Sequence, residues 1–321
     1  MNEKFKKIAV VAIGGNSLIK DKNHQTVEDQ YQAAKETTYH IADMIEAGWD
    51  VVIGHGNGPQ VGFILRRSEI ANKVEGMHEV PLDVCGADSQ GAIGYALQQT
   101  LQNELHRRGI QKPVATVVTQ VLVERNDPAF QHPSKPIGGF MDRDEAQHRA
   151  AEMGWSVVED AGRGWRRVVA SPLPKEVVEI DSVKALIEAG VVVISVGGGG
   201  IPVIDTGNRQ LVGTAAVIDK DYASSLLARL VNADLFLIST AVEKVAINFG
   251  QPEQKWIDRM TMAEAKQYLA EGTHFAKGSM APKIQAVLWF LEAGGKQALI
   301  TDPENIGRAL KGETGTWILP K

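Results

Sequence analysis

Short runs of apolar residues recur along the chain, and each run ends in glycine or in a polar turn. Continuous apolar runs are typical of parallel strands, because helices cover both faces of a parallel sheet and leave no face for polar side chains. The sequence therefore predicts a series of fully buried strands. They are expected at residues 8–13, 51–53, 114–123, 191–196, 235–238 and 298–300.

Helical patterns separate these runs. Apolar positions in the segment 29–47 recur at spacings of three and four, and Gly48 follows as a C-terminal stop. Pro59 and Pro282 each precede an amphipathic stretch, and each is expected at the first helical position, where its missing N–H costs nothing. Strands that alternate with helices predict a layered α/β fold.

The segment 124–170 breaks this alternation because it is mostly polar. A helix is expected at 142–153, and the stretches WSVVED and GWRRVVAS, joined through 161–163, are expected to form a hairpin. The segment is too short and too polar to support a large core of its own. It is therefore predicted to be an inserted subdomain that protrudes from the main sheet.

Composition excludes several classes of protein. The 321 residues are 44% hydrophobic and 23% charged, which is the ordinary globular range. A net charge of −5 argues against a nucleic-acid-binding protein. The apolar run 8–13 is too short for a signal peptide, and no stretch approaches the roughly 20 apolar residues that span a bilayer. With Cys85 as its one cysteine, the chain is expected in the cytoplasm, without a membrane partner.

Glycines gather where three predicted strands end. Gly14, Gly15 and Asn16 follow the first strand, the segment 54–59 (GHGNGP) follows the second, and 197–200 (GGGG) follows a later one. The carboxyl ends of parallel strands meet at one sheet edge, so these turns would offer clustered N–H groups to phosphate oxygens. Each glycine could instead serve only a tight turn. Three such turns, each expected to precede a helix, favour an anion site.

Two nucleotide-binding motifs are missing from this edge. The chain has no GxxxxGK[ST] pattern, which excludes a P-loop enzyme. No GxGxxG follows the first strand, which weakens a dinucleotide-binding interpretation.

Lysines stand at the starts of two predicted helices. Lys220 and Lys283 oppose the helix macrodipole there, at a cost of about 0.3–1 kcal/mol each, and a bound polyphosphate would reverse that sign. Each could instead be solvated or paired with Asp219 or Asp221. Lys135 lies between two prolines that would present it from a stiff loop, although a loop lysine is often simply solvated.

Other candidate residues carry weaker signals. His55 is expected to orient its loop, because no second histidine or cysteine lies at metal-ligand spacing. Cys85 is expected to be a small, partly buried apolar residue. Arg163, Arg166 and Arg167 could clamp an anion over the site or form a solvated hairpin.

Taken together, these motifs make the chain resemble the carbamate kinases of the amino acid kinase family over essentially its whole length. The motifs that carry the resemblance are VVAIGGNSL (10–18), HGNGPQVG (55–62), PLDVCGADSQGAIGYALQQ (81–99), VVTQVLV (117–123), HPSKPIG (132–138), EDAGRGWRRVVASPLP (159–174), GGGGIPV (197–203), AVIDKDYAS (216–224) and GSMAPK (278–283).

The resemblance implies an α/β fold, a three-layer αβα sandwich on a mostly parallel sheet of about eight strands, with a small protruding subdomain. It implies one domain over 1–321, with a carbamate-side half (1–123 and 171–204), the insertion 124–170, and a nucleotide-binding half (205–321). It also implies a homodimer and the reaction ATP + carbamate ⇌ ADP + carbamoyl phosphate with Mg²⁺. In many relatives the reaction runs toward ATP during arginine, agmatine or purine breakdown.

Site residues follow from the resemblance by matching position. Lys283 would stabilise the transition state from the nucleotide side and Lys135 from the substrate side, while Asp221 holds the lysines in place. Lys135 stands in for a lysine that related kinases place before their first glycine pair. The implied catalytic residues are Lys135, Lys220, Asp221 and Lys283; the substrate- and phosphoryl-binding residues are Gly14, Gly15, Asn16, Gly56, Asn57, Gly198 and Gly199; the nucleotide-binding residues are Asp219, Lys220, Thr240, Val245, Lys277, Met280 and Lys283.

Two other functions remain open at this stage. Another amino acid kinase would phosphorylate a larger acid such as glutamate or acetylglutamate, and would have no evident use for Lys135. A non-catalytic regulator that binds a nucleotide or carbamoyl phosphate could share the fold. Retention of Lys135, Lys220, Asp221 and Lys283 argues against the regulator.

Overall fold

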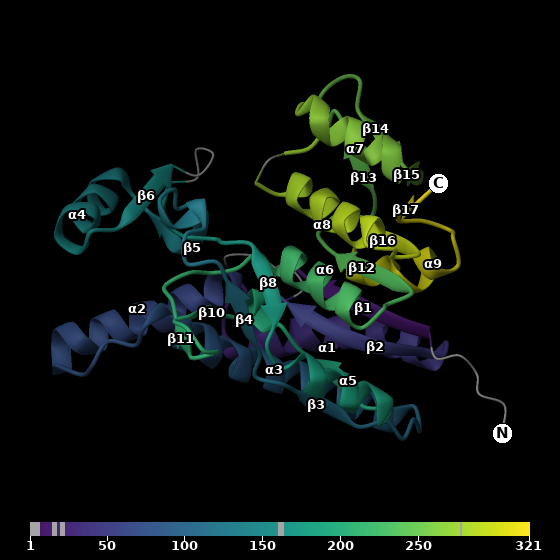
Figure 1. The fold of residues 1–321 in the computed structure, drawn as a ribbon, viewed down its shortest axis with the longest axis horizontal. Coiled ribbons are helices and arrows are strands. Elements are labelled where there is room, and N and C mark those ends of the chain that lie inside the picture. The colour runs from purple at the N-terminus through teal and green to yellow at the C-terminus, as the bar shows by residue number, and fades with distance from the viewer. Residues whose placement is uncertain (1–6, 15–17, 20–22, 160–163, 277) are drawn as a thin grey trace.

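An eight-stranded sheet forms the middle layer of the computed structural model, which describes residues 7–14, 18–19, 23–159, 164–276 and 278–321. Neighbouring strands run parallel except for β16 and β17, which confirms the predicted mostly parallel sheet (Figure 1). The strand order is β15 (Arg259–Thr261), β17 (Thr316–Leu319), β16 (Gln297–Thr301), β12 (Leu235–Ser239), β1 (Lys7–Ile13), β2 (Trp49–His55), β9 (Val192–Ile194) and β3 (Val114–Thr116).

Helices cover both faces of this sheet, because alternate side chains of each strand point to opposite faces. In β1, Val10 and Ala12 join one buried cluster, whereas Ala9, Val11 and Ile13 join the other. The first face is covered by α5 (Ile180–Glu188), α6 (Lys220–Leu230), α7 (Met262–Glu271) and α8 (Met280–Glu292), and the second by α1 (Val27–Glu46), α3 (Leu82–Arg107) and α9 (Ile306–Leu310).

Helix boundaries follow local signals in the sequence. Thr26 and Asp29 form a capping box at the start of α1, and the helix ends at Glu46, within two residues of the prediction. Pro59 lies in the first turn of α2 (Gly58–Glu75), close to the expected position. The prediction for Pro282 was wrong, because α8 begins two residues earlier at Met280. Proline is tolerated throughout a first turn, where N–H groups lack intrahelical partners anyway.

The prediction of a single strand over 114–123 was also wrong. The chain leaves the main sheet after β3 and enters a second sheet as β4 (Gln120–Val123). Between the two strands, the Gln90 side chain accepts a hydrogen bond from the Thr119 N–H and donates one to the Thr119 carbonyl. The same carbonyl accepts from the Ile201 N–H at 2.8 Å, so the backbone pairing passes here from the main sheet to the second sheet. The second sheet has the order β11 (Leu211–Gly213), β10 (Ile201–Asp205), β4 and β8 (Pro174–Val177).

The segment 124–170 protrudes from the main body, at the left of Figure 1. Its helix α4 (Arg143–Met153) and the hairpin of β6 (Ser156–Glu159) and β7 (Trp165–Val169) lie as predicted, although the hairpin turn at 160–163 falls outside the described residues. A third strand, β5 (Lys135–Met141), was not predicted, because its proline and two glycines hide the strand pattern. The sheet order is β5, β7 and β6.

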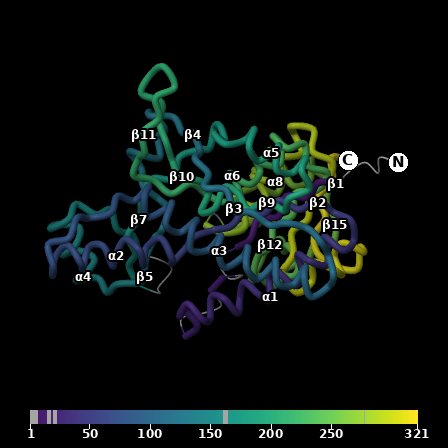
Figure 2. The backbone as a smooth tube through the Cα atoms, turned by 90° about the horizontal axis from the view of Figure 1, so that it is seen from below, coloured from purple at the N-terminus to yellow at the C-terminus, as the bar shows by residue number. Residues whose placement is uncertain are grey.

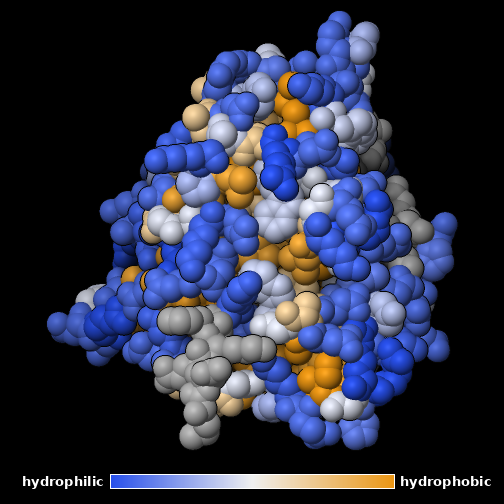
Figure 3. Space-filling model, turned by 90° about the vertical axis from the view of Figure 1, so that its right-hand side faces the viewer, coloured by the Kyte–Doolittle hydropathy of each residue, from blue (hydrophilic) through white to orange (hydrophobic). Residues whose placement is uncertain are grey.

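A hairpin outside the main sheet completes the fold. The strands β13 (Val245–Ile247) and β14 (Lys255–Ile257) form a hairpin that lies outside the main sheet. On the face that carries the C-terminal elements, the surface is mostly hydrophilic with hydrophobic residues scattered among the polar ones (Figure 3). Within the described part of the chain, no helix combines the length and apolar character needed to cross a membrane.

Arg108 ties α1 to α3 on the second face. Its side chain is only 8% exposed, and its guanidinium contacts Asp43 at 2.6 Å, Glu46 at 2.9 Å and Glu104 at 2.7 Å. Hydrogen bonds from Arg107 and then from Arg108 lower the pKa of Glu104 to about 2, despite the opposing effect of burial. Because burial of Arg108 requires all of its donors to be paired, the two helices are fixed to each other at this end.

We predict that Arg108→Ala lowers the free energy of unfolding by about 2 kcal/mol, because it leaves the Glu104 and Asp43 carboxylates without their buried partner. Because the pKa of Glu104 is lowered, its contribution to stability is present above pH 4.5 and is lost as the pH falls toward 2. The Arg108→Ala variant lacks part of this contribution, so it should lose less stability than the wild type across that pH range. Urea unfolding at several pH values measures both effects. Arg209→Ala, which removes an exposed pair with Glu176, is the control and should cost less than about 1 kcal/mol. An equal loss in both variants would contradict the prediction.

Candidate active site

A cleft of about 370 Å³ opens where β1, β2 and β12 end, at the carboxyl edge of the main sheet. It receives residues from both halves of the chain and from the protruding subdomain. Such an edge is where open α/β sheets bind their ligands. Of the residues predicted for the site, those that line the cleft are Gly14, Gly56, Asn57, Lys135, Gly198, Asp219, Lys220, Asp221, Thr240 and Lys283.

The remaining predicted residues are not placed in the cleft wall. Val245 is buried on β13 and donates its N–H to Thr316 Oγ1 at 2.8 Å. Gly199 is buried one residue beyond Gly198, and Met280 begins α8 beside the lining residue Ser279. Three further predicted residues, Gly15, Asn16 and Lys277, lie outside the described residues.

Asp221 is the buried centre of the cleft. It is 3% exposed, and its carboxylate accepts from Lys220 through Oδ1 and from Lys283 through Oδ2, the latter at 2.9 Å. Burial alone would raise the pKa of this carboxyl, but the two ammonium groups outweigh burial and hold the pKa well below its usual range. Asp221 therefore remains ionised and pairs with both lysines.

Lys135 reaches the cleft from the subdomain. Its Nζ lies 2.6 Å from Asp219 Oδ2, across 84 residues of sequence. The other carboxylate oxygen of Asp219 accepts from the Asp221 N–H at 2.9 Å and so caps α6. Burial alone would raise the pKa of Asp219, but Lys135 lowers it overall. One carboxylate thus connects the subdomain to the helix that carries Lys220.

The cleft has an excess of positive charge. Three lysines (Lys135, Lys220 and Lys283) face two carboxylates (Asp219 and Asp221), which leaves one net positive charge among these five side chains. Burial lowers the pKa of Lys220 to about 8, and the nearby Lys283 ammonium adds to that effect. An anion in the cleft would therefore favour the protonated form of Lys220.

The glycine turn 197–200 packs directly on the loop that follows β2 and contains Asn57. A Cβ at Gly198 would lie 2.4 Å from Asn57 Nδ2, so only glycine allows this approach. Asn57 Nδ2 also donates to Ser89 Oγ at 3.1 Å. The expectation that a helix follows this turn was wrong, because a short 3₁₀ turn, η3 (Gly197–Gly199), leads into the strand β10.

Two buried polar residues of α3 position these loops and were missed in the sequence. Ser89 accepts from Asn57, and Gln90 Nε2 donates to the Gly197 carbonyl at 2.9 Å. Both side chains are almost fully buried on a helix. Two adjacent polar residues on an otherwise apolar helix face are the sequence signal that could have identified them.

Some backbone N–H groups of the glycine turns already donate hydrogen bonds within the fold. Gly14 donates to the Ser239 carbonyl and Gly56 to the Ile13 carbonyl, each at 3.0 Å. In the first turn of α2, Pro59 has no N–H and Val61 donates to the Asn57 carbonyl at 3.0 Å, so the N–H groups that lack an acceptor within the helix are those of Gly58 and Gln60. Contact between an anion and the Gly56 amide stays a prediction, and the start of α2 is the better placed donor.

His55 supports its loop, as expected. It is fully buried, and its Nδ1 lies 2.9 Å from the Gly56 carbonyl, which makes Nδ1 the donor. Burial lowers the pKa of His55 to about 4, so the ring is neutral near pH 7. Within the described residues, no group of three or more His, Cys, Asp or Glu residues could hold a metal ion.

The hairpin arginines that the structure describes bond to groups that do not line the cleft. Arg166 donates to the Gly138 carbonyl at 3.0 Å, and Arg167 contacts Glu69 at 3.4 Å. Neither lines the cleft. Arg163 lies outside the described residues. The hairpin arginines that are described therefore connect the subdomain to itself and to α2.

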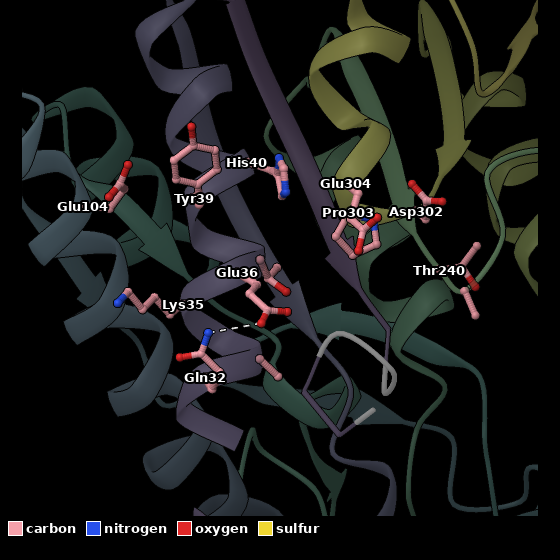
Figure 4. Close-up of a pocket in the computed structure, with 13 residues that line it drawn as sticks. Gln32, Lys35, Glu36, Tyr39, His40, Glu104, Thr240, Asp302, Pro303 and Glu304 are labelled. Carbon is pink, nitrogen blue, oxygen red and sulfur yellow. Dashed lines mark hydrogen bonds between the residues drawn. The ribbon is translucent and has the colours of Figure 1, made fainter. Parts of the chain in front are cut away.

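A larger hollow of about 750 Å³ lies beside the cleft and shares Thr240 and Ala241 with it. Figure 4 shows its wall, formed by α1 residues such as Gln32 and Glu36, which are hydrogen-bonded, and by Asp302 to Glu304. It holds none of the three lysines of the cleft. Size alone would select this hollow, but the paired charges identify the smaller cleft as the candidate active site.

Comparison with known proteins identifies the family of this chain. The family model of the amino acid kinase family matches residues 7–302, and the chain belongs to this family. Its relatives within the family include carbamate kinases and proteins named after them. The chain is 54% identical over 318 residues to the carbamate kinase-like protein YahI of Escherichia coli K12, covering 98% of this chain and 99% of that protein. It is 50% identical over 314 residues to the carbamate kinase of Thermococcus kodakarensis, with the same coverage.

Solved structures give the same result. The carbamate kinase from Giardia lamblia bound to AMP-PNP superimposes with a TM-score of 0.90 at 40% identity, covering 98% of this chain and 99% of that one. An N-acetylglutamate synthase from Neisseria gonorrhoeae, at 14% identity and a TM-score of 0.57, shares the fold alone.

We predict that Asp221→Asn lowers the free energy of unfolding by about 3 kcal/mol, because it leaves Lys220 and Lys283 buried together without their shared anion. Asp258→Asn, at an exposed pair with Lys244, is the control and should cost less than about 1 kcal/mol. Urea unfolding near pH 7 measures both. A wild-type-like midpoint and slope for Asp221→Asn would show that Asp221 does not compensate the lysines.

Proposed function

We infer that the protein is a carbamate kinase, which transfers a phosphoryl group between ATP and carbamate in a reversible reaction. The observation that carries this inference is the approach of Lys135 from the inserted subdomain to Asp219, next to Lys220 and Lys283. Three lysines from three separate segments meet at a sheet edge that resembles, in fold and sequence, that of enzymes named carbamate kinases.

The chemistry requires charge stabilisation more than proton transfer. In the direction that makes ATP, a terminal phosphate oxygen of ADP attacks the phosphorus of carbamoyl phosphate, and the bond from phosphorus to the carbamoyl oxygen breaks. Carbamate leaves as an anion, so no general base or acid is required. Charge spreads over the transferred phosphoryl oxygens in such transfers, and fixed cations lower the barrier.

The lysines can share this task from different sides. Lys283, in the first turn of α8, would contact the transferred group from the nucleotide side, and Lys220 would contact nucleotide phosphates. Lys135 would approach from the substrate side. Asp221 touches the two nucleotide-side lysines and Asp219 touches Lys135, so each side has its own carboxylate partner.

Finer features of the function belong to the same proposal. We propose that Mg²⁺ accompanies the nucleotide and is held by its phosphates, because Asp219 and Asp221, the carboxylates of the cleft wall, already pair with lysines. A homodimer, a cytoplasmic location, net flux toward ATP and the division into a carbamate-side and a nucleotide-binding half remain proposals. Residues of both proposed halves line the cleft, which supports the division.

The direct test is ATP formation from ADP, Mg²⁺ and carbamoyl phosphate, followed by a coupled assay. We expect turnover with carbamoyl phosphate and little or none with the acyl phosphates of glutamate or acetylglutamate. Lys283→Ala should reduce turnover by roughly 100-fold, because it removes a cation that stabilises transition-state charge. Lys266→Ala, an exposed lysine paired with Glu292, should retain full activity.

Two outcomes would reject the proposal. Binding of ADP without turnover of carbamoyl phosphate would identify a regulator, and preference for an amino acid acyl phosphate would identify another amino acid kinase. Full activity of a folded Lys283→Ala variant would remove Lys283 from the mechanism while leaving the reaction in place.

Lys135→Ala should affect the kinetics with carbamoyl phosphate more than those with ADP. The side chain contacts Asp219 from the subdomain, so its loss should raise KM for carbamoyl phosphate and lower kcat by roughly 10- to 100-fold. KM for ADP should change less than about threefold. Separate initial-rate series for each substrate measure this. A larger change in KM for ADP than for carbamoyl phosphate would place Lys135 on the nucleotide side.

A further inference from the structure

Lys135 is carried by an inserted subdomain, so something must hold that subdomain at a fixed distance from the cleft. The backbones of α2 and β5 touch at two glycines. A Cβ built at Gly62 would lie 2.2 Å from Gly138 Cα and 2.3 Å from Gly138 N. Gly138 itself has φ of +68°, a conformation that favours glycine, and lies three residues from Lys135 on the same strand. Figures 1 and 2 both show β5 next to α2.

A small apolar cluster lies beside this contact, since Val61 and Ile137 belong to it and are next in sequence to the two glycines. Its member Ile137 is two residues from Lys135, and its member Val217 is two residues from Asp219. Because both residues belong to one packed cluster, that cluster restrains both partners of the ion pair. We call this group the joint cluster; it consists of Val61, Leu82, Cys85, Ile137, Val169 and Val217, which are 0–7% exposed.

Polar contacts fix the same interface at its outer side. Glu69 of α2 is 8% exposed and contacts Arg167 of β7 at 3.4 Å. The Arg167 guanidinium stacks on the Trp155 ring at 4.5 Å, and Arg149 lies over the same ring at 5.0 Å. In the sheet, Arg167 is in register with Ile137, so this contact and the joint cluster act on one point of β5.

Helix α2 therefore connects two parts of the candidate active site. Its first residue, Gly58, lines the cleft directly after Gly56 and Asn57, and Gly62 lies one turn further along. The glycine contact sets how closely β5 approaches that turn. We propose that Gly62 is a positioning residue, which sets the reach of Lys135 into the cleft by allowing β5 to lie against α2. This inference rests on the proposed role of Lys135 in phosphoryl transfer.

A methyl group at Gly62 cannot be accommodated by rotation of a side chain, because the atoms that it meets belong to the backbone. Ordinary contact begins at 3.4 Å, well beyond the 2.2 Å available. The strand β5 must therefore move away from α2 and carry Lys135 with it. A displacement of about 1 Å at a catalytic group can reduce a rate by roughly 100-fold.

The matched control lies on the same strand. A Cβ at Gly139 would meet no heavy atom within 4 Å outside its own neighbours, so Gly139→Ala tests the loss of a glycine from β5 without a clash. Gly62→Ala should lower kcat with carbamoyl phosphate by roughly 10- to 100-fold and change KM for ADP less than twofold. Gly139→Ala should match the wild type within about twofold.

A double-mutant cycle with Lys135→Ala identifies the route of the effect. If Gly62 acts through Lys135, then Gly62→Ala should cost less than about threefold in kcat/KM when Lys135 is already alanine. The same loss in both backgrounds would overturn the proposal. If Gly62→Ala does not give folded protein, Ile137→Ala replaces it in the double-mutant cycle with Lys135→Ala. This substitution leaves a cavity in the joint cluster instead of a clash, and the same result is expected.

A third measurement separates this inference from the proposed function. Acetylation of Lys135 by acetic anhydride, followed by mass spectrometry, reports the position of its ammonium group without any turnover. If Gly62→Ala moves Lys135 away from Asp219, Lys135 should be acetylated several-fold faster in this variant than in the wild type. In Gly139→Ala the rate should match the wild type. No change in Gly62→Ala would overturn the positioning role. Wild-type protein without carbamoyl phosphate turnover, but with the expected acetylation change, would reject the proposed function alone.

Discussion

The buried carboxylate of Asp221 is the constraint on which the cleft depends. Two ammonium groups from different helices cannot lie near each other in a protein interior without a shared counter-charge. Asp221 supplies that charge at 3% exposure and fixes α6 and α8 relative to each other through Lys220 and Lys283. The arrangement remains one positive charge in excess once Lys135 and Asp219 are included. The protein alone therefore leaves the cleft electrostatically incomplete, which suits an anionic ligand.

Much of the fold follows from the sequence because the main strands are buried on both faces. Runs such as 8–13 and 235–238 have no polar positions to obscure the pattern, and both are strands of the main sheet. Strands that are not buried on both faces were harder to predict. β5 contains Pro136, Gly138 and Gly139, residues that are rare in strands, and it is ordered by pairing with β7 and by contact with α2.

The site was only partly predictable for a related reason. Lys220 and Lys283 each stand at the start of a helix, and the cost of a positive charge there is visible without a structure. The partnership of Lys135 with Asp219 spans 84 residues, so no local pattern contains it. Ser89 and Gln90 escaped notice because they act from a neighbouring helix on loops far away in sequence. The break at Thr119 has the same origin, since its N–H bonds to a distant glutamine and its carbonyl accepts from that glutamine and from Ile201 of the second sheet.

The contact between Gly62 and Gly138 also bears on how the inserted segment can be exchanged between proteins. In sequence the segment is a contiguous insertion and looks like a portable module. In the structure its lysine depends on a glycine of α2, on Val61 and Val217 of the main body, and on Glu69. Grafting residues 124–170 alone onto another sheet of this fold would transfer the lysine without its distance to the cleft. The transferable unit is the insertion together with the helix on which it rests.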